Sequence, residues 1–255
     1  MSDPNQQWQP PPPPPLAGEP DAGPVMSTPA TLTGIFFEPG RVFESFRSRP
    51  KFLVAGLILL LLTAGVTALV YQRINMEQYI RTKMEQNPRN ANQTEEQKEM
   101  GVKIGKIVGA VLIPGSVPIS IAAGAALYLL GVMAFGGSIS YKKSLAVWTY
   151  SSFPPAILGT IVAVLVLLLK AAEDIDPEHL LVTNPGAFMT GEGSSPVLVA
   201  LLSQFDILRF YGLFLAAIGL RKVAKISSGS AWAIVLGFFL IRAILGVSSA
   251  AIFGG

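Results

Sequence analysis

The stretch SSPVLVALLSQFDILRFYGLFLAAIGLRK (residues 194–222) decides the fold class, because it is long and apolar enough to cross a bilayer. It nevertheless carries Asp206 and Arg209 near its middle, and the next apolar stretch, AWAIVLGFFLIRAILGVSSAAIF, carries Arg242 in the same way. A charge at membrane depth costs about 2.5–3.5 kcal/mol on insertion scales. These three residues therefore form a predicted intramembrane polar cluster, the part of the chain most closely tied to function.

Five apolar stretches of spanning length follow one another, at about 52–72, 107–136, 145–169, 196–220 and 231–252. The chain has 255 residues and is only 14% charged, whereas soluble domains are about 25% charged. The sequence thus predicts an all-α, polytopic membrane protein with a five-transmembrane-helix bundle. Two prolines, Pro114 and Pro118, leave the start of the second span open, and Pro154 and Pro155 are expected to break or bend the third.

Residues 1–33 are polar and rich in proline, with a run from Pro10 to Pro15. This composition favours a disordered tail, and a ligand for a polyproline-binding groove is the less favoured alternative. We expect the first 31 residues to be dispensable for folding, with the membrane domain covering residues 34–252.

A short basic segment precedes the first span, in the sequence GRVFESFRSRPKF. On a helix, Val42, Phe43 and Phe46 share one face and the arginines point elsewhere. This pattern predicts an interfacial amphipathic helix. The same aromatic residues could equally pack beneath the helix bundle, and the two interpretations are compatible.

The chain contains no cysteine and one histidine, and no phosphate-binding or hydrolase motif is present. The loop from Lys170 to Ser195 is acidic, but its spacing matches no metal-binding loop, so we expect no metal and no cofactor. The net charge of +3 is spread over loops, which argues against a nucleic-acid partner.

Lysine and arginine are unevenly distributed among the short loops. The segment before the first span, the loop after the second and the loop after the fourth are basic, and with five spans they fall on one side. The positive-inside rule then places the N-terminus in the cytoplasm and the C-terminus outside, with the bacterial cytoplasmic membrane as the expected location.

Three segments resemble the bacterial branch of the Yip family: GIFFEPGRVFESFRSRPKF, WTYSSFPPAIL and FDILRFYGLFLAAIGLRKVAKISSGSAW. The resemblance covers about residues 34–252 and leaves the long first loop unmatched. It implies a five-span bundle with a cytoplasmic N-terminus, and it does not imply an enzyme. The family is named for eukaryotic members that bind Ypt/Rab GTPases, but their GTPase-related motifs are not visible here.

Two functions follow as hypotheses. The first is a non-enzymatic scaffold or adaptor in membrane organisation or traffic, whose partners are the lipid bilayer and a protein bound through the N-terminal tail or the amphipathic helix. The second is a small transporter or channel subunit that uses Asp206, Arg209 and Arg242 as a polar pathway. A structural ion pair of Asp206 with Arg242, Arg209 or both is the simpler role for these charges. The oligomeric state stays open.

Overall fold

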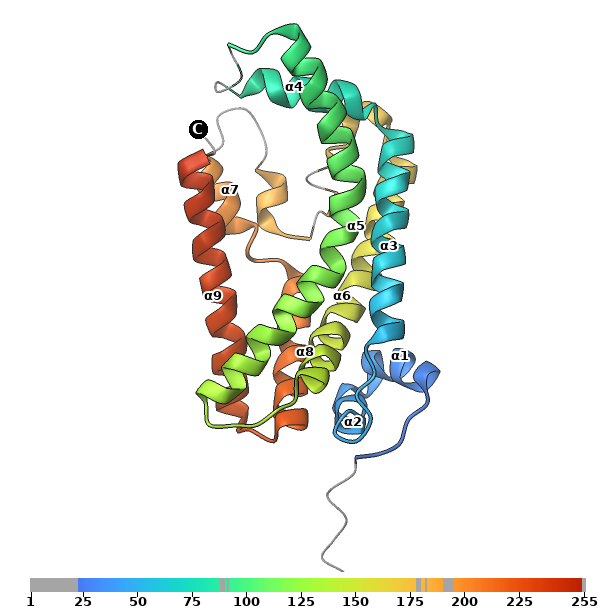
Figure 1. The fold of residues 1–255 in the computed structure, drawn as a ribbon, viewed down its shortest axis with the longest axis vertical. Helices are drawn as coiled ribbons and strands as arrows, with labels where there is room; N and C mark the ends of the chain where they lie inside the picture. Colours follow the sequence, from blue (N-terminus) through green and yellow to red (C-terminus); the bar gives the residue numbers. More distant parts are fainter. Residues whose placement is uncertain are drawn as a thin grey trace, which may run out of the picture.

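The computed structural model describes residues 23–87, 90, 92–177, 180–181, 183–189 and 195–253. Four helices in this part are apolar and long enough to cross a membrane: α3 (Leu53–Arg73), α5 (Glu95–Ala134), α6 (Tyr141–Leu169) and α9 (Ser228–Phe253). Helices α7 (Pro196–Leu202) and α8 (Ile207–Ala224) form a fifth unit, bent by 46° at a short break (Figure 1). The all-α, polytopic fold with up to five spans is confirmed.

Smaller helices lie at the two ends of the bundle. Helices α1 (Thr28–Phe37) and α2 (Pro39–Ser45) pack at one end, and α4 (Met76–Gln86) lies at the other, near the C-terminus (Figure 1). Two 3-10 turns, η2 (Ala172–Asp174) and η4 (Pro185–Phe188), lie in the chain between α6 and α7. The termini of the described chain are therefore at opposite ends, as an odd number of crossings requires.

The helix that contains the second span begins well before the apolar stretch at 107–136. Helix α5 has 40 residues and runs unbroken through Pro114 and Pro118. Its first turn is fixed by a capping box, in which Thr94 and Gln97 each bond the other's backbone N–H. At 1.5 Å per residue the helix is about 60 Å long, twice the hydrocarbon thickness, so its polar first turns project beyond the membrane.

The expectations for the third and fourth spans need correction. Helix α6 passes through Pro154 and Pro155 without a break. At this site α8 packs closely through Gly212, where a Cβ atom would lie 3.4 Å from the Ser151 carbonyl oxygen, whose usual donor in the helix is replaced by proline. The fourth span, expected to be one helix over 196–220, is instead the bent pair α7–α8.

The main core fills the half of the bundle that contains α1 and α2. Phe43, Phe46 and Tyr150 are fully buried or nearly so, and the Phe46 and Tyr150 ring centroids are 4.8 Å apart. At Gly219 of α8 an added Cβ would lie 2.9 Å from Phe43 and 2.8 Å from Val147, so glycine allows α2, α6 and α8 to meet. Burial of this kind contributes about 25 cal/mol per Å² of apolar surface.

The N-terminal cap, defined as α1 and α2 (residues 28–45), shortens the predicted tail and favours one of the two interpretations of the basic segment. The predicted tail reached residue 33, but α1 begins at Thr28, and the fully buried Thr31 hydroxyl lies 3.0 Å from the Tyr150 hydroxyl. Residues 1–22, which hold the proline run, lie outside the described residues. Val42, Phe43 and Phe46 are each 0% exposed, so the predicted interfacial face packs against the bundle.

Polar bonds also hold the cap in place. Lys222, near the end of α8, donates to Glu44 at 2.6 Å, and Arg47 donates to the Lys222 carbonyl oxygen at 2.7 Å. Lys51 donates to the Met26 carbonyl oxygen at 2.6 Å. The cap, the α5–α6 loop and the α8–α9 turn all lie at this end, which we call the basic end (Figure 1). Its lysines and arginines are Arg41, Arg47, Arg49, Lys51, Lys142, Lys143, Arg221, Lys222 and Lys225.

Replacing Thr31 by valine should lower the free energy of unfolding by about 1–3 kcal/mol, because the Tyr150 hydroxyl loses a buried partner. Thr33→Val is the matched control on the same helix, since Thr33 is exposed and bonds only the Pro29 carbonyl oxygen. Thermal unfolding in detergent measures both. Equal effects of the two substitutions would mean that α1 is not docked on Tyr150.

Candidate functional site

The break between α7 and α8 is built around Asp206. Its side chain accepts a hydrogen bond from the backbone N–H of Arg209 at 3.0 Å and another from the Thr183 hydroxyl at 2.6 Å. The backbone N–H of Ile207 donates to the Thr183 carbonyl oxygen at 3.2 Å. Asp206 is therefore the N-cap of α8, and it ties the new helix to the loop that precedes α7.

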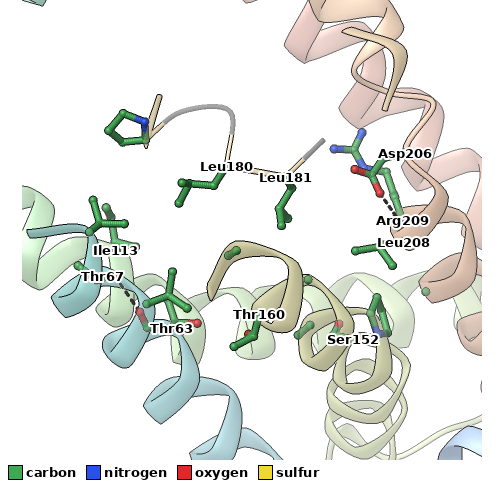
Figure 2. A pocket seen from close by; sticks show the side chains of 18 of the residues that line it. Thr63, Thr67, Ile113, Ser152, Thr160, Leu180, Leu181, Asp206, Leu208 and Arg209 are labelled. Carbon is green, nitrogen blue, oxygen red and sulfur yellow. Dashed lines mark hydrogen bonds between the residues drawn. The ribbon is translucent and has the colours of Figure 1, made fainter. Parts of the chain in front are cut away.

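A cavity of about 1000 Å³ lies beside this break and extends toward the basic end as far as Tyr128 and Trp148. Its walls come from α3, α4, α5, α6, α8 and α9, together with the segment around Leu180 and Leu181. Figure 2 shows Asp206 and Arg209 at one end of the cavity, and Thr63, Thr67 and Ile113 at the opposite end. The cavity is partly open and mostly apolar, as ligand sites usually are.

All three residues of the predicted polar cluster line this cavity, but their bonds differ from simple ion pairs. The Arg209 guanidinium donates to the Gln204 side-chain oxygen at 2.5 Å, a neutral acceptor. Arg242 makes no hydrogen bond or salt bridge with the described part of the chain. The Asp206 carboxylate accepts its hydrogen bonds from the Thr183 hydroxyl and the backbone of α8. The structure thus brings the cluster together around a cavity without pairing its charges directly.

Two contributors to this site were missed from the sequence, Thr183 and Gln204. Thr183 comes from a loop 23 residues away, so no local pattern could point to it. Asp206 itself carried a usable signal, because an aspartate directly before an apolar helical run is a typical N-cap.

The acidic loop gives no metal site within the described residues. There, no group of three or more histidine, aspartate or glutamate side chains lies close enough to share an ion. His179, Glu178 and Glu192 lie outside the described residues.

Comparison with known proteins assigns the fold to a family. The Yip1 domain model matches residues 33–250, from within α1 to the last turns of α9. The chain belongs to the Yip1 family. It is 26% identical over 231 residues to "Membrane protein YknW" of Bacillus subtilis (strain 168), an alignment covering 91% of this chain and 94% of that protein. No solved structure matches.

Family membership confirms the resemblance found in the sequence and the assignment as an integral membrane protein. The matched range contains both the N-terminal cap from Thr33 onward and the cavity residues Asp206, Arg209 and Arg242. The cap and the cavity are thus features of the Yip1 domain as this chain forms it.

Replacing Asp206 by leucine should lower the free energy of unfolding by about 1–2 kcal/mol, because α8 loses its N-cap. Asp206→Asn is the matched control, since asparagine caps as well as aspartate but carries no charge. We expect the asparagine variant to stay close to the parent in thermal unfolding.

The double variant Asp206→Leu/Arg242→Leu separates capping from charge pairing. If capping is the main role of Asp206, adding Arg242→Leu should restore none of the stability lost in Asp206→Leu. Recovery of stability in the double variant, together with a large loss in Asp206→Asn, would instead establish a direct ion pair.

Proposed function

We propose that this Yip1-family protein is a non-enzymatic scaffold or adaptor of the bacterial cytoplasmic membrane, with the basic end in the cytoplasm. The observation that carries the proposal is the N-terminal cap, which is held on the bundle by buried side chains and by the Lys222–Glu44 pair. A rigid surface beside the membrane is what an adaptor needs, since little ordering entropy is lost when a partner binds.

The cap also presents an apolar residue at its outer surface. Phe37, the last residue of α1, is 85% exposed, next to Glu38 and Arg41, whose side chains pair at 3.2 Å. An exposed aromatic ring beside charged side chains can take part in a protein contact. Phe37 is thus the natural centre of a contact surface on the cap.

A carrier or channel fits the structure less well. The three intramembrane charges line a partly open cavity, and the buried core of Phe43, Phe46 and Tyr150 fills the bundle at the basic end. A transport route has to connect both sides of the membrane. The geometry therefore supports binding at the cavity more than passage through the bundle.

A photo-crosslinking side chain at Phe37 should trap a discrete protein adduct in membranes of the native host. The matched control is the same side chain at Leu240, which is 57% exposed on α9 in the middle of the membrane-spanning region. We expect lipid adducts at Leu240 and a protein adduct at Phe37. Lipid adducts alone at both positions would count against the adaptor role.

Single cysteines test the orientation, because the chain contains none of its own. A cysteine at Ser228, exposed in the α8–α9 turn, should resist an impermeant maleimide in intact cells. One at Gln78, exposed on α4 at the opposite end, should react. Both should react after the membrane is permeabilised, and the reverse pattern in intact cells would invert the topology.

A further inference from the structure

We infer that the cavity beside the α7–α8 break binds an anionic phospholipid, with its phosphate between Arg209 and Arg242 and part of an acyl chain in the apolar remainder. This inference goes beyond the proposed scaffold role and does not depend on it. It rests on three observations: the positive charge of the lining, the depth of the two arginines in the membrane, and the bonding of the threonine hydroxyl groups to their own helix.

The charge of the described lining is positive. Its ionised side chains are Arg209, Arg242 and Asp206, which leaves a net charge of about +1. The carboxylate is already engaged by Thr183 and by the start of α8, while one guanidinium has only an amide acceptor and the other has no partner in the described chain. Unpaired guanidinium groups at membrane depth favour an anion, and phosphate matches their planar fork of donors.

The two arginines lie at the same depth. Arg209 is 15 residues from the end of α8 and Arg242 is 14 residues from the start of α9, so both lie about 21–23 Å from the turn that joins these helices. With that turn at one membrane surface, the Cα atoms of both arginines are about 8 Å inside the opposite surface of a 30 Å hydrocarbon layer. A lipid head group of the far leaflet reaches this depth with only local thinning.

The opposite end of the cavity offers apolar surface. Thr63 and Thr67 donate their hydroxyl protons to carbonyl oxygens of their own helix, at 2.9 and 2.8 Å. Ile113 lies at the same end, and Leu180 and Leu181 lie between this end and Arg209 (Figure 2). A phosphate alone would leave this surface in contact with water, whereas an acyl chain covers it. The distribution of charge and apolar surface therefore matches an amphiphile rather than a free anion.

The test uses the purified full-length chain in detergent micelles, with phosphatidylglycerol or phosphatidylcholine of the same acyl chains as probes. Thermal unfolding over a lipid concentration series gives the apparent affinity. We expect phosphatidylglycerol to raise the unfolding temperature more than phosphatidylcholine, and inorganic phosphate to have little effect. Equal effects of the two lipids, or a phosphate effect as large as that of phosphatidylglycerol, would overturn the inference, the latter in favour of a free-anion site.

Variants locate the binding. Arg242→Gln should weaken phosphatidylglycerol binding at least about tenfold, since a charge-assisted contact is lost, and Arg242→Lys should retain part of it. Arg221→Gln is the matched control, because Arg221 is exposed at the other end of α8 and outside the cavity. An equal loss in the Arg221 variant would assign binding to surface charge and overturn the site.

Thr160→Phe fills the cavity from α6 and leaves both arginines in place. We expect it to weaken phosphatidylglycerol binding as strongly as Arg242→Gln. Unchanged binding in this variant would show that no acyl chain enters the cavity. If Arg242→Gln does not fold, the comparison of the two lipids on the parent chain and Thr160→Phe still decides the question.

Discussion

The need to bond every backbone group at membrane depth is the constraint on which this structure depends. In a continuous helix the backbone groups bond one another, whereas those at the α7–α8 break need other partners. Asp206 resolves the conflict by accepting from the Arg209 N–H, while Thr183 supplies a carbonyl oxygen to Ile207 and a hydroxyl to the Asp206 carboxylate. The costly charge is thus the element that permits the bend, and the bend sets the position of Arg209 and the wall of the cavity.

The two halves of the bundle follow from this break. Where α8 continues unbroken, it packs against α2 and α6, and the interior is filled by Phe43, Tyr150 and their neighbours. Beyond the break, α9 packs instead on the short α7 (Figure 1), and the cavity lies beside the break. One end is thus a closed, basic surface fixed to the N-terminal cap, and the other half can accept a ligand.

Much of the fold was predictable because span length is a physical requirement that hydropathy reports directly. The bend was not predicted, since averaging over about 18 residues hides a break of four. Residues 28–33 were predicted to belong to the polar tail because their own sequence shows no feature that orders them. Their order depends on the bond between Thr31 and Tyr150, which are 119 residues apart. At the site, Asp206, Arg209 and Arg242 could be recognised because a charge at membrane depth is energetically costly. Thr183 and Gln204 are uncharged and carry no such signal.

The position of the two arginines links the cavity to the rest of the molecule. Arg209 follows the cap of α8 by three residues, and Arg242 lies on α9 at the same depth, near the ring contact of Phe210 with Phe239, whose centroids are 5.8 Å apart. An anion held by both guanidinium groups would link α8 to α9. The same helix carries Lys222 near its other end, where Lys222 donates a hydrogen bond to Glu44 of the N-terminal cap. Helix α8 thus contacts both the proposed lipid site and the surface proposed for a partner.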